Sequence, residues 1–304
     1  ARTCSGIGDA IPTVLTMTVV PILGAGSSMA DYRIGFKWWA LIIAVVFVIS
    51  ELVCVVCVPE RPVACDEKPG KISDMFKALF KNDQAMTVVV SIILVYTSLN
   101  ICGNLVLYFF RFDVGNEGAY SIFVAVAFAA QVLVMMVIPL LRKRFSKSQL
   151  FISGFIIQIA GFAVILIMAF AKLYTPQSWY ILCLPGILIY LGYGMLNVIM
   201  TIFLSDSVDY GEVMNGTREE SVIFSMQTFT VKLASGIAVF LAGLVVDWIN
   251  LDTAAAVQTQ DTLDALRMWM TFPSVILLIV GIFVFKRFYK LDDTRMEEIK
   301  SKLN

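Results

Sequence analysis

Acidic and basic side chains gather in one stretch of the sequence, between two long apolar segments. Asp206, Asp209 and Glu212 follow the first of these segments, and Arg218 precedes the second. No histidine, nucleophile or metal-binding pattern at a spacing typical of catalysis accompanies these side chains. They can instead form ion pairs with one another and with neighbouring basic residues. This charged stretch is therefore the first candidate for function.

A lysine lies deep in the apolar segment that follows. Lys232 is 11 residues beyond Ser221, which puts it about 16 Å into a hydrocarbon layer about 30 Å thick. A lysine at that depth costs at least about 2.5 kcal/mol on insertion, so it should face a partner or a water-filled cavity. A lysine that snorkels to the interface is the alternative, but the nearest helix end is too far away. We favour a functional role for Lys232.

Composition places the whole chain in a membrane. Of 304 residues, 59% are hydrophobic and 15% charged, with a mean hydropathy of +0.84, far from a soluble domain. The net charge of zero gives no indication of the basic surface that nucleic-acid-binding proteins carry. The absence of histidine removes the commonest general base and metal ligand. Cys54 and Cys57 form a CxxC on a hydrophobic segment, where packing is the expected role. We expect an all-α membrane protein without a metal site or cofactor.

Hydropathy predicts eight membrane spans joined by polar segments. They cover residues 2–23, 36–58, 85–110, 119–141, 150–172, 179–204, 222–248 and 266–285. The chain starts with Ala rather than Met and opens almost directly in a span, so we expect an N-terminally truncated chain. Within the first span, Asp9 could be a packing partner, a substrate contact or a sign that the helix starts later.

The loops set the orientation. The longest polar connection, residues 59–84, contains a pattern typical of a short amphipathic helix at the membrane surface. Sixteen Lys and Arg residues fall on the side of this connection and of the C-terminal tail, and five on the other. By the positive-inside rule the sixteen-rich side is cytoplasmic. Asn215 and Gly216 predict a turn on that side, before the seventh span.

Several spans carry polar side chains at helical spacing. In the third span Tyr96, Asn100, Asn104 and Tyr108 recur every four residues, which gives a polar stripe on one helix face. Two interpretations stay open: hydrogen bonds to other helices, or the wall of a hydrated cavity. Asn197 adds a carboxamide in the sixth span. Amides and tyrosines of this kind suit a sugar, whose hydroxyl groups need many partners.

Small residues mark close helix packing in two spans. Gly186, Gly192 and Gly194 make the sixth span thin and bendable, and alanines recur every four residues in the seventh span, at positions 234, 238 and 242. In the seventh span, Thr228 and Lys232 also share a helix face, with Gln227 about a turn and a half below the lysine.

Five sequence strings together resemble one transporter family. D-x-V-D-Y-G-E (Asp206 to Glu212), R-x-E-S (Arg218 to Ser221) and Q-T-x-x-V-K (Gln227 to Lys232) occur in order, and KNDQ (Lys81 to Gln84) and RFYKL (Arg287 to Leu291) extend the match. This combination resembles the glycoside/pentoside/hexuronide:cation symporters, the melibiose permease-like branch of the major facilitator superfamily. The resemblance covers essentially the whole chain.

The resemblance implies a fold of twelve helices in two bundles, of which the eight spans look like helices 5–12. Residues 1–58 are then the last two helices of the N-terminal bundle, and residues 59–84 a cytoplasmic linker. Residues 85–286 form the C-terminal six-helix bundle, and residues 287–304 a cytoplasmic tail. The family's cation-binding and principal sugar-binding aspartates lie in helices 1, 2 and 4, outside this match.

The resemblance also implies roles for individual residues. Lys232 is expected between the bundles near the sugar and cation sites, with Gln227 and Thr228 near the sugar pathway and Arg2 lining the sugar site. The cytoplasmic gate is expected to use the charged residues Asp206, Asp209, Glu212 and Arg218. The candidate substrate-binding residues are thus Lys232, Gln227, Thr228, Arg2, Asn197, Tyr96 and Asn100. Asn197 stands where the melibiose permease has a tryptophan, which argues against melibiose as the substrate.

These observations predict a monomeric sugar:cation symporter of the plasma (bacterial cytoplasmic) membrane. It would carry a glycoside, pentoside or hexuronide with Na⁺, H⁺ or Li⁺ by alternating access. Its other partner is membrane lipid, and no nucleic acid is expected. A transporter-derived sensor that binds without flux is the alternative. An integral-membrane enzyme is disfavoured because no HExxH, P-loop or paired CxxC motif is present.

Overall fold

The structure is a computed structural model that describes residues 2–26, 29–57, 80–216, 220–253, 255 and 257–303. The described residues form helices and short connections, with no strand among them, which confirms the expected all-α fold. The chain divides into two compact units, residues 3–70 and residues 71–304. The expected amphipathic helix in the 59–84 connection falls almost entirely outside the described residues.

The first unit contains α1 (Arg2–Gly24) and α2 (Met29–Cys57). Gly35 lets these helices cross closely, because a Cβ at this position would lie 2.0 Å from the Val20 carbonyl oxygen. The indole N–H of Trp39 donates to the Thr16 hydroxyl at 2.8 Å. Because α1 is helical from Arg2 onward, Asp9 lies inside the helix, and a later helix start is excluded.

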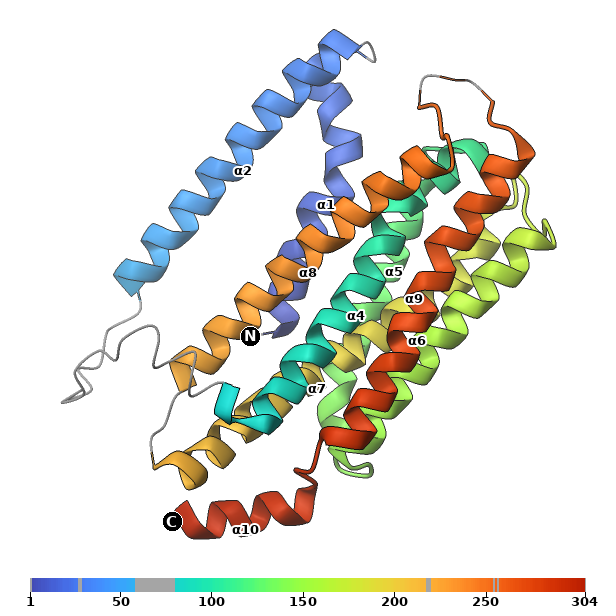
Figure 1. Ribbon diagram of the computed structural model, residues 1–304. Coiled ribbons are helices and arrows are strands. Elements are labelled where there is room, and N and C mark those ends of the chain that lie inside the picture. Colours follow the sequence, from blue (N-terminus) through green and yellow to red (C-terminus); the bar gives the residue numbers. More distant parts are fainter. Residues whose placement is uncertain are drawn as a thin grey trace. The chain divides into compact units, whose positions relative to one another are not determined.

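The described residues of the second unit form six long helices and a C-terminal one, numbered in Figure 1. The long helices are α4 (Asp83–Tyr108), α5 (Ala119–Leu141), α6 (Lys147–Phe170), α7 (Cys183–Asn215), α8 (Glu220–Trp248) and α9 (Gln260–Phe288). A π-helical turn, η1 (Phe109–Asp113), extends α4, a 3₁₀ turn, η2 (Trp179–Leu182), precedes α7, and α10 (Asp293–Leu303) ends the chain. α4 packs against α7, α8 and α9, and α7 packs against α4, α5, α6, α8 and α10.

Seven helices among the described residues are long and apolar enough to cross a membrane: α2, α4 with η1, α5, α6, η2 with α7, α8 and α9. These seven correspond to the second to eighth expected spans. The expected first span, residues 2–23, is helix α1.

The structure corrects the end of the sixth expected span. The sequence places a connection after residue 204, but α7 continues to Asn215, so the motif from Asp206 to Glu212 is helical. Gly216 then ends the helix in the left-handed conformation at φ 72°, which only glycine adopts at no steric cost. This confirms the predicted turn at Asn215 and Gly216.

Glycines bring α6 and α7 into close contact. A Cβ on Gly192 would lie 2.6 Å from the Gly154 carbonyl oxygen, and a Cβ on Gly161 would lie 2.7 Å from the Ile189 backbone nitrogen. α7 runs through its glycines without a break, so here they serve packing rather than a bend. The three alanines of α8, residues 234, 238 and 242, are also buried, as predicted for close helix packing.

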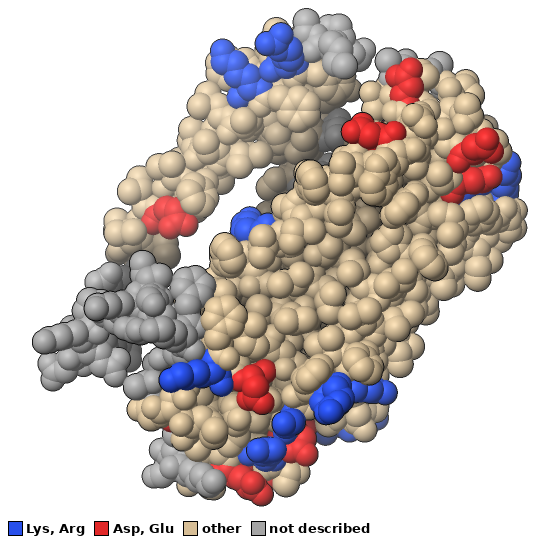
Figure 2. All heavy atoms as spheres, in the orientation of Figure 1, with Lys and Arg blue, Asp and Glu red and all other residues tan. Residues whose placement is uncertain are grey.

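Charged side chains of the second unit gather at the two ends of its helices, with an almost uncharged band between them (Figure 2). We call the end that carries Arg142, Lys147 and α10 the basic end, and the end that carries η1 and the α8–α9 connection the opposite end. Successive long helices run between these ends in alternating directions, as the alternating spans predict.

Candidate functional site

A polar cluster lies inside the helical unit, at mid-length of α4 and α7. The Asn197 carboxamide donates to the Tyr96 hydroxyl at 2.6 Å and lies 3.4 Å from the Tyr193 hydroxyl. The rings of Tyr96 and Tyr193 meet edge to face with centroids 5.5 Å apart. All three side chains are at most 9% exposed. We call Tyr96, Tyr193 and Asn197 the mid-helix polar cluster.

The polar stripe of α4 continues beyond this cluster. The Asn100 carboxamide N–H donates to the Tyr96 carbonyl at 2.7 Å, and the Asn104 carboxamide N–H donates to the Asn100 carbonyl at 2.7 Å. Each bond uses one of the two N–H groups of its amide and leaves the amide oxygen free to accept. Both side chains are half-buried. The two interpretations of the stripe thus each hold in part: Tyr96 bonds to another helix, whereas Asn100 and Asn104 keep binding capacity.

The candidate residues of α8 point in different directions. Gln227 is buried and its carboxamide lies 3.5 Å from the Thr201 hydroxyl of α7. Thr228 and Lys232 are exposed, on the same helix face, as the spacing predicted. Lys232 makes no hydrogen bond or ion pair with the described residues. Its position is about 18 Å along α8 from Glu220, so it lies at the same mid-helix depth as the polar cluster.

Arg2 is the first residue of α1, and its side chain lies outside the described part of the structure, as does all of Arg218. The structure therefore gathers Tyr96 and Asn197 directly and places Asn100 one turn away.

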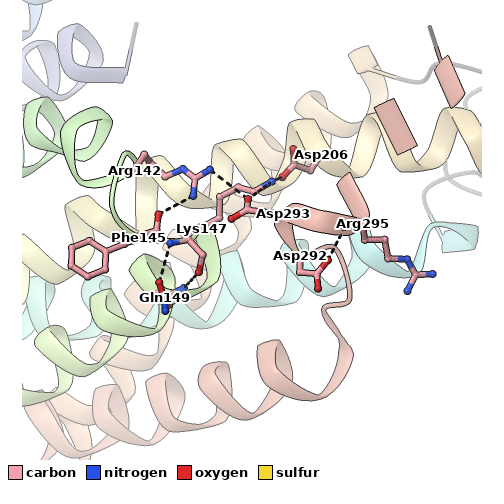
Figure 3. A network of polar contacts seen from close by, with 9 residues as sticks. Arg142, Phe145, Lys147, Gln149, Asp206, Asp292, Asp293 and Arg295 are labelled. Carbon is pink, nitrogen blue, oxygen red and sulfur yellow. Dashed lines mark hydrogen bonds and ion pairs between the residues drawn. The ribbon is translucent and has the colours of Figure 1, made fainter. Parts of the chain in front are cut away.

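At the basic end, four charged side chains from α5, α6, α7 and α10 form one network (Figure 3). The Lys147 ammonium pairs with the Asp206 carboxylate, and both side chains are less than 10% exposed. Asp293 links this pair to Arg142, at 3.4 Å from the Lys147 ammonium and 3.5 Å from the Arg142 guanidinium. We call these four residues the basic-end network.

The network joins helices that are far apart in the sequence. Asp206 of the predicted gate is part of it, whereas Asp209 and Glu212 lie farther along α7 and make contacts of their own. Lys147 is one of the sixteen Lys and Arg residues on the side predicted to be cytoplasmic, and its partner Asp206 is 59 residues away. No local signal pointed to this pair.

The KNDQ string ties the start of α4 to the same end of the unit. Asn82 caps α4 by accepting from the Ala85 backbone N–H at 2.9 Å, and it donates to the Ser207 carbonyl of α7 at 2.8 Å. Gly211 leaves room for this side chain, since a Cβ there would lie 2.8 Å from the Asn82 amide nitrogen. The Gln84 amide oxygen accepts from the Lys290 backbone N–H at 2.8 Å.

An apolar cluster holds α10 beside this network. Leu291, Met296 and Ile299 are buried, and Tyr210, Val213 and Tyr289 pack against them. Burial, reinforced by the nearby Asp206 and Asp293 carboxylates, raises the pKa of Tyr289. The strings that carry the family resemblance, KNDQ, D-x-V-D-Y-G-E and RFYKL, thus meet at one place in the fold.

A second buried ion pair lies at the opposite end, and no sequence pattern predicts it. The Arg267 guanidinium of α9 donates to both carboxylate oxygens of Asp113, at 2.8 and 2.5 Å, and both side chains are 3% exposed. The Tyr174 hydroxyl donates to the same carboxylate at 2.5 Å. Burial and this carboxylate raise the pKa of Tyr174. The π-helical turn η1 places Asp113 for these contacts.

The described residues contain no group of three or more His, Cys, Asp or Glu side chains that could hold a metal ion. What they do contain is a polar cluster enclosed at mid-membrane depth and charged networks at both helix ends. Intramembrane polar side chains of this kind, facing a helical bundle interior, mark substrate pathways. Fold and site together define a multi-pass integral membrane protein with polar side chains inside a helical bundle.

The chain belongs to the MFS/sugar transport protein family, whose model matches residues 2–293. It is 26% identical to the raffinose carrier protein of Pediococcus pentosaceus over 93% of this chain and 44% of the relative. It is 25% identical to the isoprimeverose transporter of Lactiplantibacillus pentosus, over 94% and 58%. It is also 25% identical to the uncharacterized symporter YjmB of Bacillus subtilis, over 77% and 49%. The chain spans about half the length of these relatives.

Proposed function

We propose that this chain works in sugar:cation symport by alternating access, with a glycoside, pentoside or hexuronide as the sugar and Na⁺, H⁺ or Li⁺ as the coupling cation. The mid-helix polar cluster is the observation that carries the proposal. A buried carboxamide and two phenols at mid-membrane depth supply both donors and acceptors for sugar hydroxyls. The family membership and the names of the relatives as carriers and a symporter support this assignment.

In this proposal, residues 1–58 end the N-terminal bundle, residues 59–84 link the bundles, and residues 85–286 form the C-terminal bundle. The sugar binds beside Asn197, Tyr96 and Asn100 of the C-terminal bundle. Lys232, unpaired among the described residues and at the same depth, contributes a cation to the pathway, with Gln227, Thr228 and Arg2 nearby. The protein acts as a monomer and is not an enzyme.

In this proposal the basic-end network is the rigid support of the inward gate. By the positive-inside rule this end faces the cytoplasm. Asp206 is buried with Lys147, while Asp293 and Arg142 extend the network toward α10. Because a buried ion pair is costly to break once formed, the network holds the cytoplasmic ends of α5, α6 and α7 together as a rigid part. Asp209, Glu212 and Arg218 then form and break contacts with the other bundle.

The test is uptake of labelled glycosides, pentosides and hexuronides by cells that express the complete gene, with and without a sodium or proton gradient. Gradient-dependent accumulation of one sugar class is the expected result. Binding without accumulation under every gradient would replace the proposal with a sensor function.

Lys232→Ala tests the role of the mid-depth lysine. Loss of one charged hydrogen-bond donor should lower gradient-driven uptake about ten-fold. Lys143→Ala is the control, because Lys143 is an exposed lysine at the basic end and its loss should leave uptake unchanged. Equal uptake by the Lys232→Ala variant and the unaltered protein would remove Lys232 from the pathway.

A further inference from the structure

A cavity opens between α4 and α8, near the opposite end of the second unit. Its volume is about 380 Å³, and it is lined by Asn104, Tyr108, Val239, Ala242, Gly243, Val246 and Asp247. All of these residues belong to two neighbouring helices, which lie side by side in Figure 1. Tyr108 is the last residue of α4, and Asp247 is the residue before the end of α8. The cavity therefore lies near the opposite end of the helices rather than at their mid-length.

Three polar side chains that line this cavity keep hydrogen-bonding capacity that no contact among the described residues uses. The Asp247 carboxylate and the Tyr108 hydroxyl form no hydrogen bond or ion pair with the described residues. The Asn104 amide uses one N–H on the Asn100 carbonyl and keeps its oxygen and its second N–H. The cavity wall thus offers a polar ligand one carboxylate, one phenol and one carboxamide with spare hydrogen-bonding capacity.

The cavity continues the polar stripe that starts at the mid-helix polar cluster. Asn104 lies about 12 Å along the helix axis from Tyr96, and Tyr108 about 18 Å. These distances are longer than one sugar ring, and Asn100 lies between Tyr96 and Asn104 on the same helix. A chain of sugar units bound at the cluster and extending along α4 would therefore reach the cavity.

We infer that the α4–α8 cavity is an outer sugar subsite, which binds the second or third unit of an oligosaccharide whose first unit lies at the mid-helix polar cluster. This inference rests on the proposed sugar transport. Asp247 accepts hydrogen bonds from two neighbouring sugar hydroxyls, and Asn104 both donates and accepts. The Tyr108 ring offers an apolar face to the C–H side of the sugar, together with Val239 and Val246.

The composition of the wall favours a sugar over an ion. Among the described residues, Asp247 is the only acidic one that lines the cavity, and no basic residue lines it, so a divalent cation lacks ligands and an anion lacks a partner. Gly243 provides the space, because a Cβ built on it meets no atom within 4 Å. A larger side chain at this position would occupy the cavity without disturbing the helix contacts.

Two variants of the full-length transporter test the subsite: Asp247→Asn, which removes the charged acceptor, and Gly243→Val, which fills the cavity. Each has a matched control outside the cavity. Asp261→Asn removes an exposed carboxylate at the same end, and Gly103→Val adds a side chain at another open glycine, where a Cβ also meets nothing within 4 Å. Membrane levels of all variants are measured by quantitative blotting.

The readout is the KM of uptake for nested sugars of one, two and three units: galactose and raffinose as one series, and xylose and isoprimeverose as a second. Asp247→Asn should raise the KM for the longer sugars about ten-fold, the effect of one lost charged hydrogen bond. Gly243→Val should raise the same KM because its side chain occupies the space of the outer sugar unit. Both variants should leave the KM of the single-unit sugar within about two-fold. The controls should change neither.

Three results overturn the subsite. One is an equal KM change for short and long sugars, another is no change in either cavity variant, and the third is transport of single-unit sugars alone. If the unaltered protein carries no sugar of any length, the proposed function fails as well, which separates that outcome from failure of the subsite alone.

Discussion

The buried pair of Asp113 and Arg267 gives the sharpest test of how the second unit is held together. Arg267→Met keeps most of the volume of the arginine side chain but leaves the Asp113 carboxylate buried, 3% exposed, with the Tyr174 hydroxyl as its remaining donor. Asp264, the other partner of Arg267, is 43% exposed and stays hydrated. The destabilisation therefore comes almost entirely from Asp113.

Removal of one partner from a buried ion pair costs about 3–5 kcal/mol. For a unit of this size each kcal/mol lowers Tm by about 2–4 °C, so Arg267→Met should lower Tm by about 10 °C. Adding Asp113→Leu removes the unpaired charge and should restore much of the loss. In the double variant the Tyr174 hydroxyl is left without an acceptor. Adding Tyr174→Phe removes this hydroxyl and should restore about 1–3 kcal/mol more of the free energy of unfolding.

The assay is thermal unfolding of the purified protein in detergent, followed by tryptophan fluorescence. Arg111→Met is the matched control: Arg111 also pairs with an acid at this end, but at 3.9 Å from Glu117 and with the two side chains 44% and 58% exposed. Its loss should cost less than about 1 kcal/mol. The reasoning is refuted if the two single variants lose the same stability, or if the double variant is no more stable than Arg267→Met.

Two further predictions concern packing and pH. Gly192→Ala should lower Tm clearly, because its Cβ would lie 2.6 Å from backbone atoms of α6, whereas Gly103→Ala should not; equal Tm values would contradict the close α6–α7 contact. The raised pKa of Tyr174 means that the neutral phenol is favoured in the folded state. The stabilising contribution of Tyr174 is therefore complete below pH about 10 and is lost as the pH rises further through the pKa of the folded state. Tyr174→Phe should therefore reduce the fall of Tm at alkaline pH. An unchanged fall of Tm at alkaline pH would contradict this.

Local patterns predicted much of the fold and part of the site. Hydropathy located the helices, because each must be apolar over about 20 residues to cross a membrane. The NG pair predicted the turn at Gly216, and the four-residue spacing predicted the stripe from Tyr96 to Asn104. The end of α7 was placed too early, because charged residues such as Asp206 suggest a loop until a partner is known. That partner, Lys147, lies on another helix.

The sequence by itself determined the class of protein, the helical spans and the family, because each depends on composition or on short strings that can be compared directly. Only the tertiary structure decided which polar groups meet. Asn197 and Tyr96 are 101 residues apart, and Arg267 and Asp113 are 154 residues apart, so no periodicity links them. The same holds for the α4–α8 cavity, whose lining residues come from two helices that are distant in sequence. Pairing across helices depends on packing geometry, and packing geometry is a property of the whole bundle.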